Sequence, residues 1–127
     1  MKIKVLALAI FLAISTSCSN DDNSDFPIIA SCGVQNPIED LEWLKKQVDE
    51  IKSDKYTTSI FAYIEIAEYK NETVFIANNC CPICNSVIPV YNCEGESLGL
   101  IHTDIEIQEI SNRRIIYKRN DSECSKD

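Results

Sequence analysis

The sequence predicts an α+β domain in which an N-terminal helix packs on an antiparallel sheet of about five strands, with a short second helix. Two patterns lead to this prediction. Residues 37–51 repeat apolar side chains at helical spacing. The segments that follow are short, rich in β-branched and aromatic residues, and separated by turn residues. A helix followed by a run of strands is typical of α+β domains with an antiparallel sheet.

The main helix is expected to begin at Asn36. Asn36 can cap it, Pro37 suits its first turn, and Glu39 can complete a capping box. Trp43 lies beside the apolar stripe of this helix and is expected to seal its edge. The polar faces are mixed in charge, whereas a helix on a membrane surface usually has a basic face, so packing on the sheet is the preferred interpretation. The stripe consists of Ile38, Leu41, Leu44, Val48 and Ile51.

Five segments are predicted as strands, namely residues 57–69, 73–78, 86–92, 97–102 and 113–119. Turns are expected at residues 70–72 and 93–96. Pro89 cannot donate a ladder hydrogen bond, so the third strand is expected either at an edge or with a bulge. Thr103 and Glu106 form a capping box, which places the short helix at residues 104–110.

The beginning of the chain has the pattern of an export signal. Lys2 and Lys4 precede an apolar run over residues 5–14, which is too short for a transmembrane helix of about 20 residues. Small residues then lead to Cys18 and resemble the lipobox of bacterial lipoproteins, although Ser15 stands where that motif usually has Leu. We predict a signal peptide at residues 1–17 and lipidation of Cys18. An ordinary signal-peptidase site at residues 15–17 is the alternative.

A polar, acidic segment without apolar residues follows Cys18 and extends to residue 25. Such a segment is expected to stay disordered, and it resembles the surface-export signal that follows the lipidated cysteine in one phylum of Gram-negative bacteria. The predicted organisation is a lipidated tether at residues 18–31, one domain at residues 32–119 and a loose tail at residues 120–127. The predicted location is the bacterial outer membrane, where acylated Cys18 enters the lipid bilayer, with display at the cell surface as an option.

The net charge of −8 bounds the partners that the chain could bind. Nucleic acids require clustered Lys and Arg for their phosphates, so they are excluded as expected partners. The same charge argues against tight adhesion to anionic lipid head groups. An acidic surface that aids solubility is the preferred interpretation.

Six cysteines besides Cys18 predict up to three disulfides in an exported domain. Six cysteines allow 15 pairings, and the sequence does not choose among them. Bridges at the first and the last of these cysteines would fasten both ends of the fold. The disulfide candidates are Cys32, Cys80, Cys81, Cys84, Cys93 and Cys124.

Redox catalysis and zinc binding are the two alternatives to structural disulfides. Cys81 and Cys84 have the spacing of thiol-disulfide oxidoreductases, but the residues after them read as a strand and not as the helix that activates the first thiol. A zinc site would need further ligands such as Cys93 and His102, and a second C-x-x-C pair is missing. The lone His102 is expected at the surface or in a turn, and no catalytic constellation is recognisable. We therefore predict structural disulfides, no enzyme activity, no metal and no cofactor.

The chain resembles a family of small bacterial lipoproteins of uncharacterised function. The resemblance covers roughly residues 32–119 and does not include the Gly-rich, Cys-containing stretch that many relatives carry, since residues 97–103 stand there instead. It implies the fold and the location but no activity. The motifs that carry it are Cys32–Gly33, Asn36–Pro37, the Leu-Glu-Trp-Leu of residues 41–44, residues 73–81, the Tyr-Asn-Cys-Glu-Gly of residues 91–95, and residues 112–117.

The functional hypothesis that follows is a non-catalytic module that binds an envelope or extracellular protein of unknown identity. An inhibitor of an exported enzyme is one form of this hypothesis. The alternative is a thiol-disulfide redox protein that uses Cys81 and Cys84.

Overall fold

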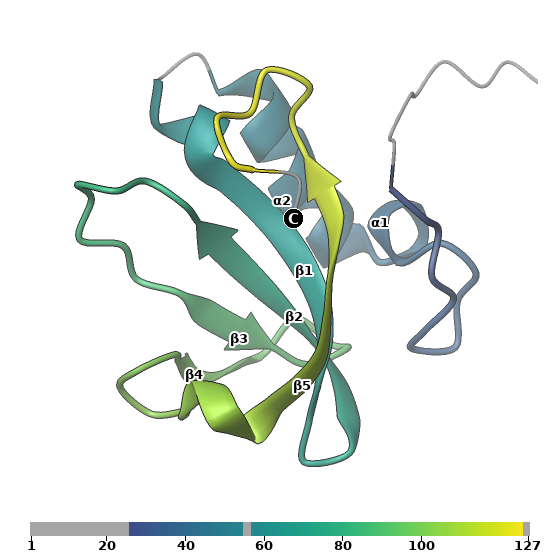
Figure 1. Cartoon of the computed structure of the whole chain (residues 1–127). Helices are drawn as coiled ribbons and strands as arrows, with labels where there is room; N and C mark the ends of the chain where they lie inside the picture. Colours follow the sequence, from purple (N-terminus) through teal and green to yellow (C-terminus); the bar gives the residue numbers. More distant parts are fainter. Residues whose placement is uncertain (1–25, 55–56, 126–127) are drawn as a thin grey trace, which may run out of the picture.

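An antiparallel sheet of five strands is the centre of the structure, a computed structural model that describes residues 26–54 and 57–125. The strands lie in the order β4-β3-β2-β1-β5. Figure 1 shows α2 behind this sheet and α1 beside it. The predicted α+β class is confirmed. The elements are α1 (Pro37–Asp40), α2 (Glu42–Ser53), β1 (Ala62–Tyr69), β2 (Glu72–Asn79), β3 (Pro89–Tyr91), β4 (Ser97–Leu100) and β5 (Ile110–Lys118), with 3₁₀ helices at Thr57–Phe61 and Ile107–Glu109.

The hairpin formed by β1 and β2 is the most regular part of the sheet. Its pairing runs without a register shift from Ala62 opposite Asn79 to Tyr69 opposite Glu72. The two connecting residues, Lys70 and Asn71, have positive φ angles of 51° and 64°. Positive φ at both central residues is the mark of a type I′ turn, whose twist matches that of the strands. The predicted turn is confirmed, and Glu72 already belongs to β2.

The helix α2 covers one face of this hairpin. Leu44 and Val48 of α2 are buried against Ile64, Ile66 and Phe75 of the sheet. The apolar stripe predicted from the sequence therefore faces the core, because Ile38, Leu41 and Ile51 also pack against this cluster. Full burial of each aliphatic side chain contributes about 1.5–3 kcal/mol.

The opposite face of the hairpin has its own apolar cluster. Alternate residues of β1 and β2, Ala67, Val74 and Ile76, point to this side. They are covered by the connection between β4 and β5, which contributes Ile101 and Ile105 to the cluster. β1 and β2 are thus buried on both faces in this part of the hairpin. The continuous run of buried residues in β2 from Val74 to Ile76 reflects this burial.

The predicted N-terminal helix is divided in two at Leu41. Leu41 has extended backbone angles (φ −92°, ψ 107°), so α1 ends and α2 begins there. The predicted cap at Asn36 is wrong in its details, because its side chain makes no capping hydrogen bond. Instead the backbone N–H of Asn36 donates to Asp40 Oδ2 at 2.8 Å. Glu39, which we expected in a capping box, forms an ion pair with Lys45 at 2.8 Å.

The third and fifth strands differ from their predicted bounds in instructive ways. β3 is an inner strand of the sheet and not an edge strand. The bulge, which was the other alternative for a strand with Pro89, is present as a register shift between Val90 and Tyr91 in the pairing with β4. Pro89 is the first residue of β3, where the missing N–H is tolerated. β5 begins at Ile110, three residues before the predicted start, and Asn112, with φ 51°, lies where its register with β1 shifts.

Two segments form 3₁₀ helices where the sequence predicted other structure. Residues 57–61 were expected as strand, but Ser59 Oγ donates to the carbonyl of Asp54, and the same region receives hydrogen bonds from Arg119. The short second helix has its capping box between Glu106 and Glu109, one turn later than predicted from Thr103 and Glu106. These long-range and local hydrogen bonds override the strand propensity of residues 57–61.

Trp43 closes the edge of the helix-side core, as predicted. Its ring packs edge-on against Phe75 with centroids 5.5 Å apart, and its Nε1–H donates to the carbonyl of Cys93 at 2.9 Å. Gly95 lies against the ring so closely that a Cβ built there would be 2.6 Å from Trp43 Cγ. The turn between β3 and β4 therefore needs glycine for both its conformation and its contact.

Gly95→Ala should destabilise the protein by about 1–3 kcal/mol more than Gly33→Ala, because it adds an overpacking cost. The two glycines form a matched pair, since both have positive φ (81° and 76°), but a Cβ at Gly33 would meet nothing within 4 Å. Urea unfolding under non-reducing conditions measures the difference. Equal losses of stability would contradict the importance of the Trp43 contact.

Candidate functional site

The six cysteines of the domain form three disulfides. The pairs are Cys32–Cys93, Cys80–Cys124 and Cys81–Cys84. The predicted use of these residues as disulfides is confirmed, and the structure supplies the connectivity that the sequence left open. Cys18, the predicted lipidation site, lies outside the described residues. The first two bridges join distant parts of the chain, whereas the third closes a ring within one loop.

The bridge Cys32–Cys93 fastens the segment before α1 to the turn between β3 and β4. Its partners are 61 residues apart in the sequence. The contacts of the domain extend further toward the N-terminus, into the region predicted as tether. Ile29 packs against the helix-side core, and the Phe26 ring lies 5.9 Å from Lys118 Nζ.

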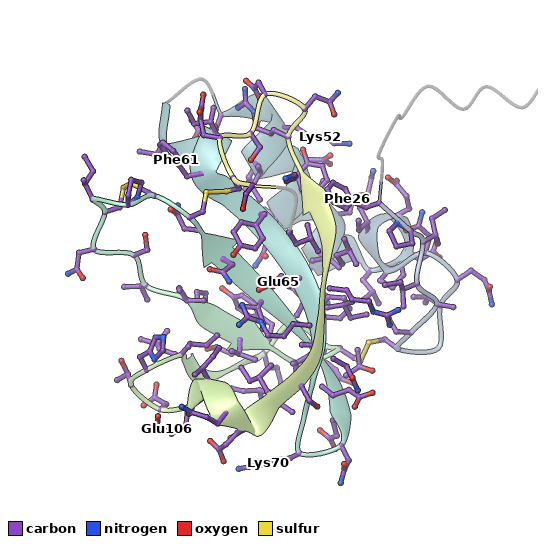
Figure 2. The ribbon with its side chains drawn as sticks, viewed as in Figure 1. Phe26, Lys52, Phe61, Glu65, Lys70 and Glu106 are labelled. Carbon is purple, nitrogen blue, oxygen red and sulfur yellow. A yellow bond between two sulfur atoms is a disulfide. The ribbon has the colours of Figure 1, made fainter. Side chains whose placement is uncertain are left out.

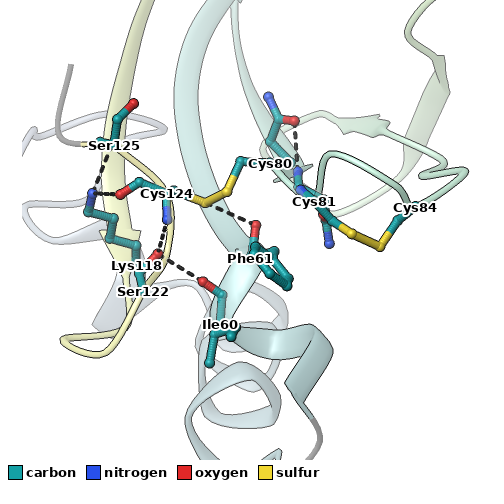
Figure 3. The surroundings of a disulfide bond; sticks show 11 residues. Ile60, Phe61, Cys80, Cys81, Cys84, Lys118, Ser122, Cys124 and Ser125 are labelled. Carbon is teal, nitrogen blue, oxygen red and sulfur yellow. Dashed lines mark hydrogen bonds between the residues drawn. A yellow bond between two sulfur atoms is a disulfide. The ribbon is translucent and has the colours of Figure 1, made fainter.

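The bridge Cys80–Cys124 fastens the C-terminal segment to the end of β2 (Figure 3). Residues 120–125 were expected as a loose tail, but they are held at several points. Ser122 Oγ and the N–H of Glu123 both donate to the carbonyl of Ile60 at 3.0 Å. Lys118 Nζ donates to the carbonyls of Cys124 and Ser125. The buried Cys124 explains this order, because the bridge draws the tail onto the sheet.

The loop between β2 and β3, residues 80–88, carries two exposed apolar side chains. We call it the cysteine loop. Ile83 is 94% exposed and Val87 is 66% exposed. Cys81 and Cys84 close the tip of the loop, and Cys84 is exposed while Cys81 is half-buried. As predicted, no helix follows Cys84, since regular structure resumes only with β3.

A chain of hydrogen bonds connects the base of the cysteine loop with the sheet. Asn79 Oδ1 accepts from the N–H of Cys81 at 2.8 Å, and Asn78 Oδ1 accepts from the N–H of Asn79 at 2.7 Å. The other end of the Asn78 amide donates to the buried Glu65, which also pairs with Arg113 at 2.8 Å. The loop therefore begins from a fixed position on β1, β2 and β5. Figure 2 shows Glu65 in the middle of this sheet face.

The pKa of Tyr63, near Glu65, is shifted. Burial raises the pKa of Tyr63 above its usual range, and the Glu65 carboxylate raises it further, while Arg113 partly opposes this effect. Nearby, an open depression of about 480 Å³ is lined by Glu68, Asn112, Arg113 and Arg114. Asn112 Nδ2 donates to Glu68 Oε2 at 2.8 Å, so two of the four lining side chains already pair with one another, and Arg113 pairs with Glu65.

The residues considered for zinc binding do not come together as a site. Cys93 is bonded to Cys32, and Cys81 to Cys84. His102 is exposed in the turn after β4 with φ 67°, where the sequence analysis expected it. Within residues 26–54 and 57–125, no group of three or more His, Cys, Asp or Glu side chains could hold a metal ion.

Sequence reasoning missed the exposed apolar residues of the cysteine loop, although a signal is present. From Thr73 to Cys93 the chain has no charged residue, whereas 25% of the whole chain is charged. An uncharged stretch that contains both a buried strand and a cysteine-rich loop indicates that part of its apolar surface faces outward. The role of Asn78 carried no such signal, because its partner Glu65 is 13 residues away in the sequence.

The chain matches no protein-family model, no curated protein and no solved structure. The resemblance to small bacterial lipoproteins therefore stays a prediction. None of the helices in the described residues has the length and apolar character needed to cross a membrane.

The three disulfides should contribute unequally to stability. Removing Cys80–Cys124 with the double substitution Cys80→Ser/Cys124→Ser should lower the free energy of unfolding by about 4 kcal/mol, because this bridge closes a long loop in the unfolded chain. The matched variant Cys81→Ser/Cys84→Ser opens a ring with a sequence separation of 3 instead of 44 and should cost about 2 kcal/mol or less. Urea unfolding without reductant measures both. A larger loss for the short ring would contradict this ranking.

Proposed function

We propose that this protein is a lipid-tethered, non-catalytic binding module that contacts a partner protein of the bacterial envelope through the cysteine loop. The observation that carries the proposal is Ile83, a large apolar side chain that is 94% exposed at the tip of a cross-linked loop. A single exposed apolar residue is common on protein surfaces. Here it is accompanied by Val87 and by an absence of charge along the loop.

The cross-links give the cysteine loop a property that suits binding. A loop that is already rigid loses little conformational entropy when a partner orders it, so more of the contact energy becomes affinity. The Cys81–Cys84 ring, the Cys80–Cys124 bridge and the hydrogen bond from Cys81 to Asn79 all restrict the loop. An apolar anchor at the centre of such a patch is the usual origin of most binding energy in an interface. The complementary partner is a protein with an apolar pocket, and an exported enzyme inhibited in this way is one form of the proposal.

The surroundings of Cys81 and Cys84 favour binding over thiol catalysis. Catalytic thiols are activated at a helix N-terminus or beside cationic residues. The segment that carries this pair has no charged residue from Thr73 to Cys93, and no helix follows it. A thiolate released here would gain no stabilisation from a cation within this segment. The geometry therefore supports a disulfide that shapes a binding loop.

Ile83→Asp should weaken capture of the partner more than about tenfold, because it puts a charge where an apolar pocket receives the anchor. Ile28→Asp is the matched control, since Ile28 is also an exposed isoleucine (70%) but belongs to the start of the described chain, which Figure 1 places beside α1. The measurement is quantitative crosslinking and pulldown from envelope extracts with the full-length proteins. If Ile83→Asp recovers the same partners in the same amounts as Ile28→Asp, the cysteine loop is not the contact surface.

The proposal includes an anchor at Cys18. Acyl chains supply membrane affinity at about 0.8 kcal/mol per buried CH₂, while the net charge of −8 gives no attraction to anionic lipid head groups. Cys18→Ala should therefore move the protein from the membrane fraction to uncleaved precursor or to a soluble product, without changing the folded domain. Fractionation and acyl labelling measure this. Normal processing and membrane association of Cys18→Ala would exclude the lipid anchor.

A further inference from the structure

The three disulfides differ in how easily an external thiol can reach them. Cys124 is 8% exposed, and its bridge joins the C-terminal segment to the end of β2. Cys32 is half-buried and packs against the helix-side core. The third bridge, Cys81–Cys84 (Figure 3), lies at the tip of the cysteine loop. Pro82, Ile83 and Cys84 are exposed there. An attacking thiolate needs access along the S–S axis, so exposure separates this bridge from the other two.

The fold does not depend on the short bridge. Its ring spans a sequence separation of 3 and lies after the end of β2 and before the start of β3. The hydrogen bonds that fix the loop base involve Asn78, Asn79 and the N–H of Cys81, and they do not require the S–S bond. The bridge can therefore open while the sheet, both apolar clusters and the long bridges stay in place.

The electrostatic surroundings suit an electron acceptor better than a nucleophile. The domain is acidic overall, with a net charge of −8 for the chain, and this charge repels anionic thiolates. The segment from Thr73 to Cys93 is free of charged residues, so an incoming thiolate meets no carboxylate within that stretch of chain. The segment also has no Lys or Arg, so no cation within it activates the thiols of the pair. The attacking thiolate must therefore come from the partner.

We infer that Cys81–Cys84 is an exchange site that accepts two electrons from a dithiol. A thiolate of the dithiol attacks Cys84 Sγ, the S–S bond breaks, and Cys81 leaves as a thiolate. The second thiol of the dithiol loses its proton and attacks the first sulfur of the same dithiol, which is bonded to Cys84 in the mixed disulfide. This attack expels the Cys84 thiolate. Both cysteines take up protons, so the partner becomes a disulfide and the loop a dithiol. This exchange opens the ring that holds Ile83, so it acts on the same loop as the binding role proposed above.

The test is stepwise reduction of the oxidised full-length chain, with Cys18→Ala to remove the unpaired thiol. Dithiothreitol is the small-molecule probe, and a peptide with its own C-x-x-C dithiol is the protein-like probe. Alkylation and peptide mapping then report each cysteine. We expect Cys81 and Cys84 to be modified at about one tenth or less of the reductant concentration that opens the other bridges, with an unchanged circular dichroism spectrum. Simultaneous reduction of all three bridges, or reduction only with loss of structure, would overturn the inference. Reduction by dithiothreitol without reduction by the peptide would limit the donor to small dithiols and overturn a protein donor.

Two variants, each with one cysteine of the pair replaced, test which sulfur is attacked. Cys81→Ser leaves the exposed Cys84 as a free thiol, and Cys84→Ser leaves the half-buried Cys81. With Ellman's reagent, Cys84 in the first variant should react about fivefold faster than Cys81 in the second, because access governs the rate when neither thiol is activated. Equal or reversed rates would overturn the assignment of Cys84 as the attacked sulfur. Peptide mapping that finds Cys80 or Cys124 in a new pairing would show rearrangement within the domain instead of exchange with the probe.

Discussion

Burial of the β1–β2 hairpin on both faces is the constraint on which the rest of the structure depends. From Ile64 to Ala67 every residue of β1 is buried, and so is every residue of β2 from Val74 to Ile76. A domain of this size has few residues with which to cover two faces. The chain uses α2 from before the hairpin on one side and residues 101–110 from after it on the other. The long disulfides fasten two other segments: the residues before α1 are joined to the turn after β3, and the C-terminal segment is joined to the end of β2.

The cysteine loop lies beyond the reach of that burial. At the end of the hairpin where the loop begins, the second face of the sheet is polar, with Glu65 and Asn78 in place of apolar residues. Buried polar groups must be paired, and here the pairing continues through Asn79 to the loop itself. Cross-linking and hydrogen bonding replace a packed core as the source of order in the loop. Ile83 and Val87 consequently face outward, whereas Ile88 at the end of the loop packs against the second apolar cluster.

The sequence predicted what short-range chemistry decides, and missed what distant partners decide. Apolar spacing identified the helical residues that face the sheet, such as Leu44 and Val48, because the period of a helix is a local property. The turn at Lys70 and Asn71 was readable for the same reason. The 3₁₀ helix at Thr57–Phe61 was not, since hydrogen bonds from the remote Arg119 hold this region. The break of the helix at Leu41 was also missed. Disulfide partners likewise depend on which strands become neighbours. The candidate site was therefore recognisable as a cysteine cluster, but its pairing and exposed side chains were not.

The position of Phe26 has a consequence for how the domain would stand on a membrane. Figure 1 places the start of the described chain beside α1, on the side of the molecule away from the cysteine loop. Seven residues lie between Cys18 and Phe26, and such a segment spans at most about 30 Å. With an anchor at Cys18, the side of the domain that carries α1 would face the bilayer. The loop that carries Ile83 would then point away from the lipid surface, toward molecules that approach from the aqueous side.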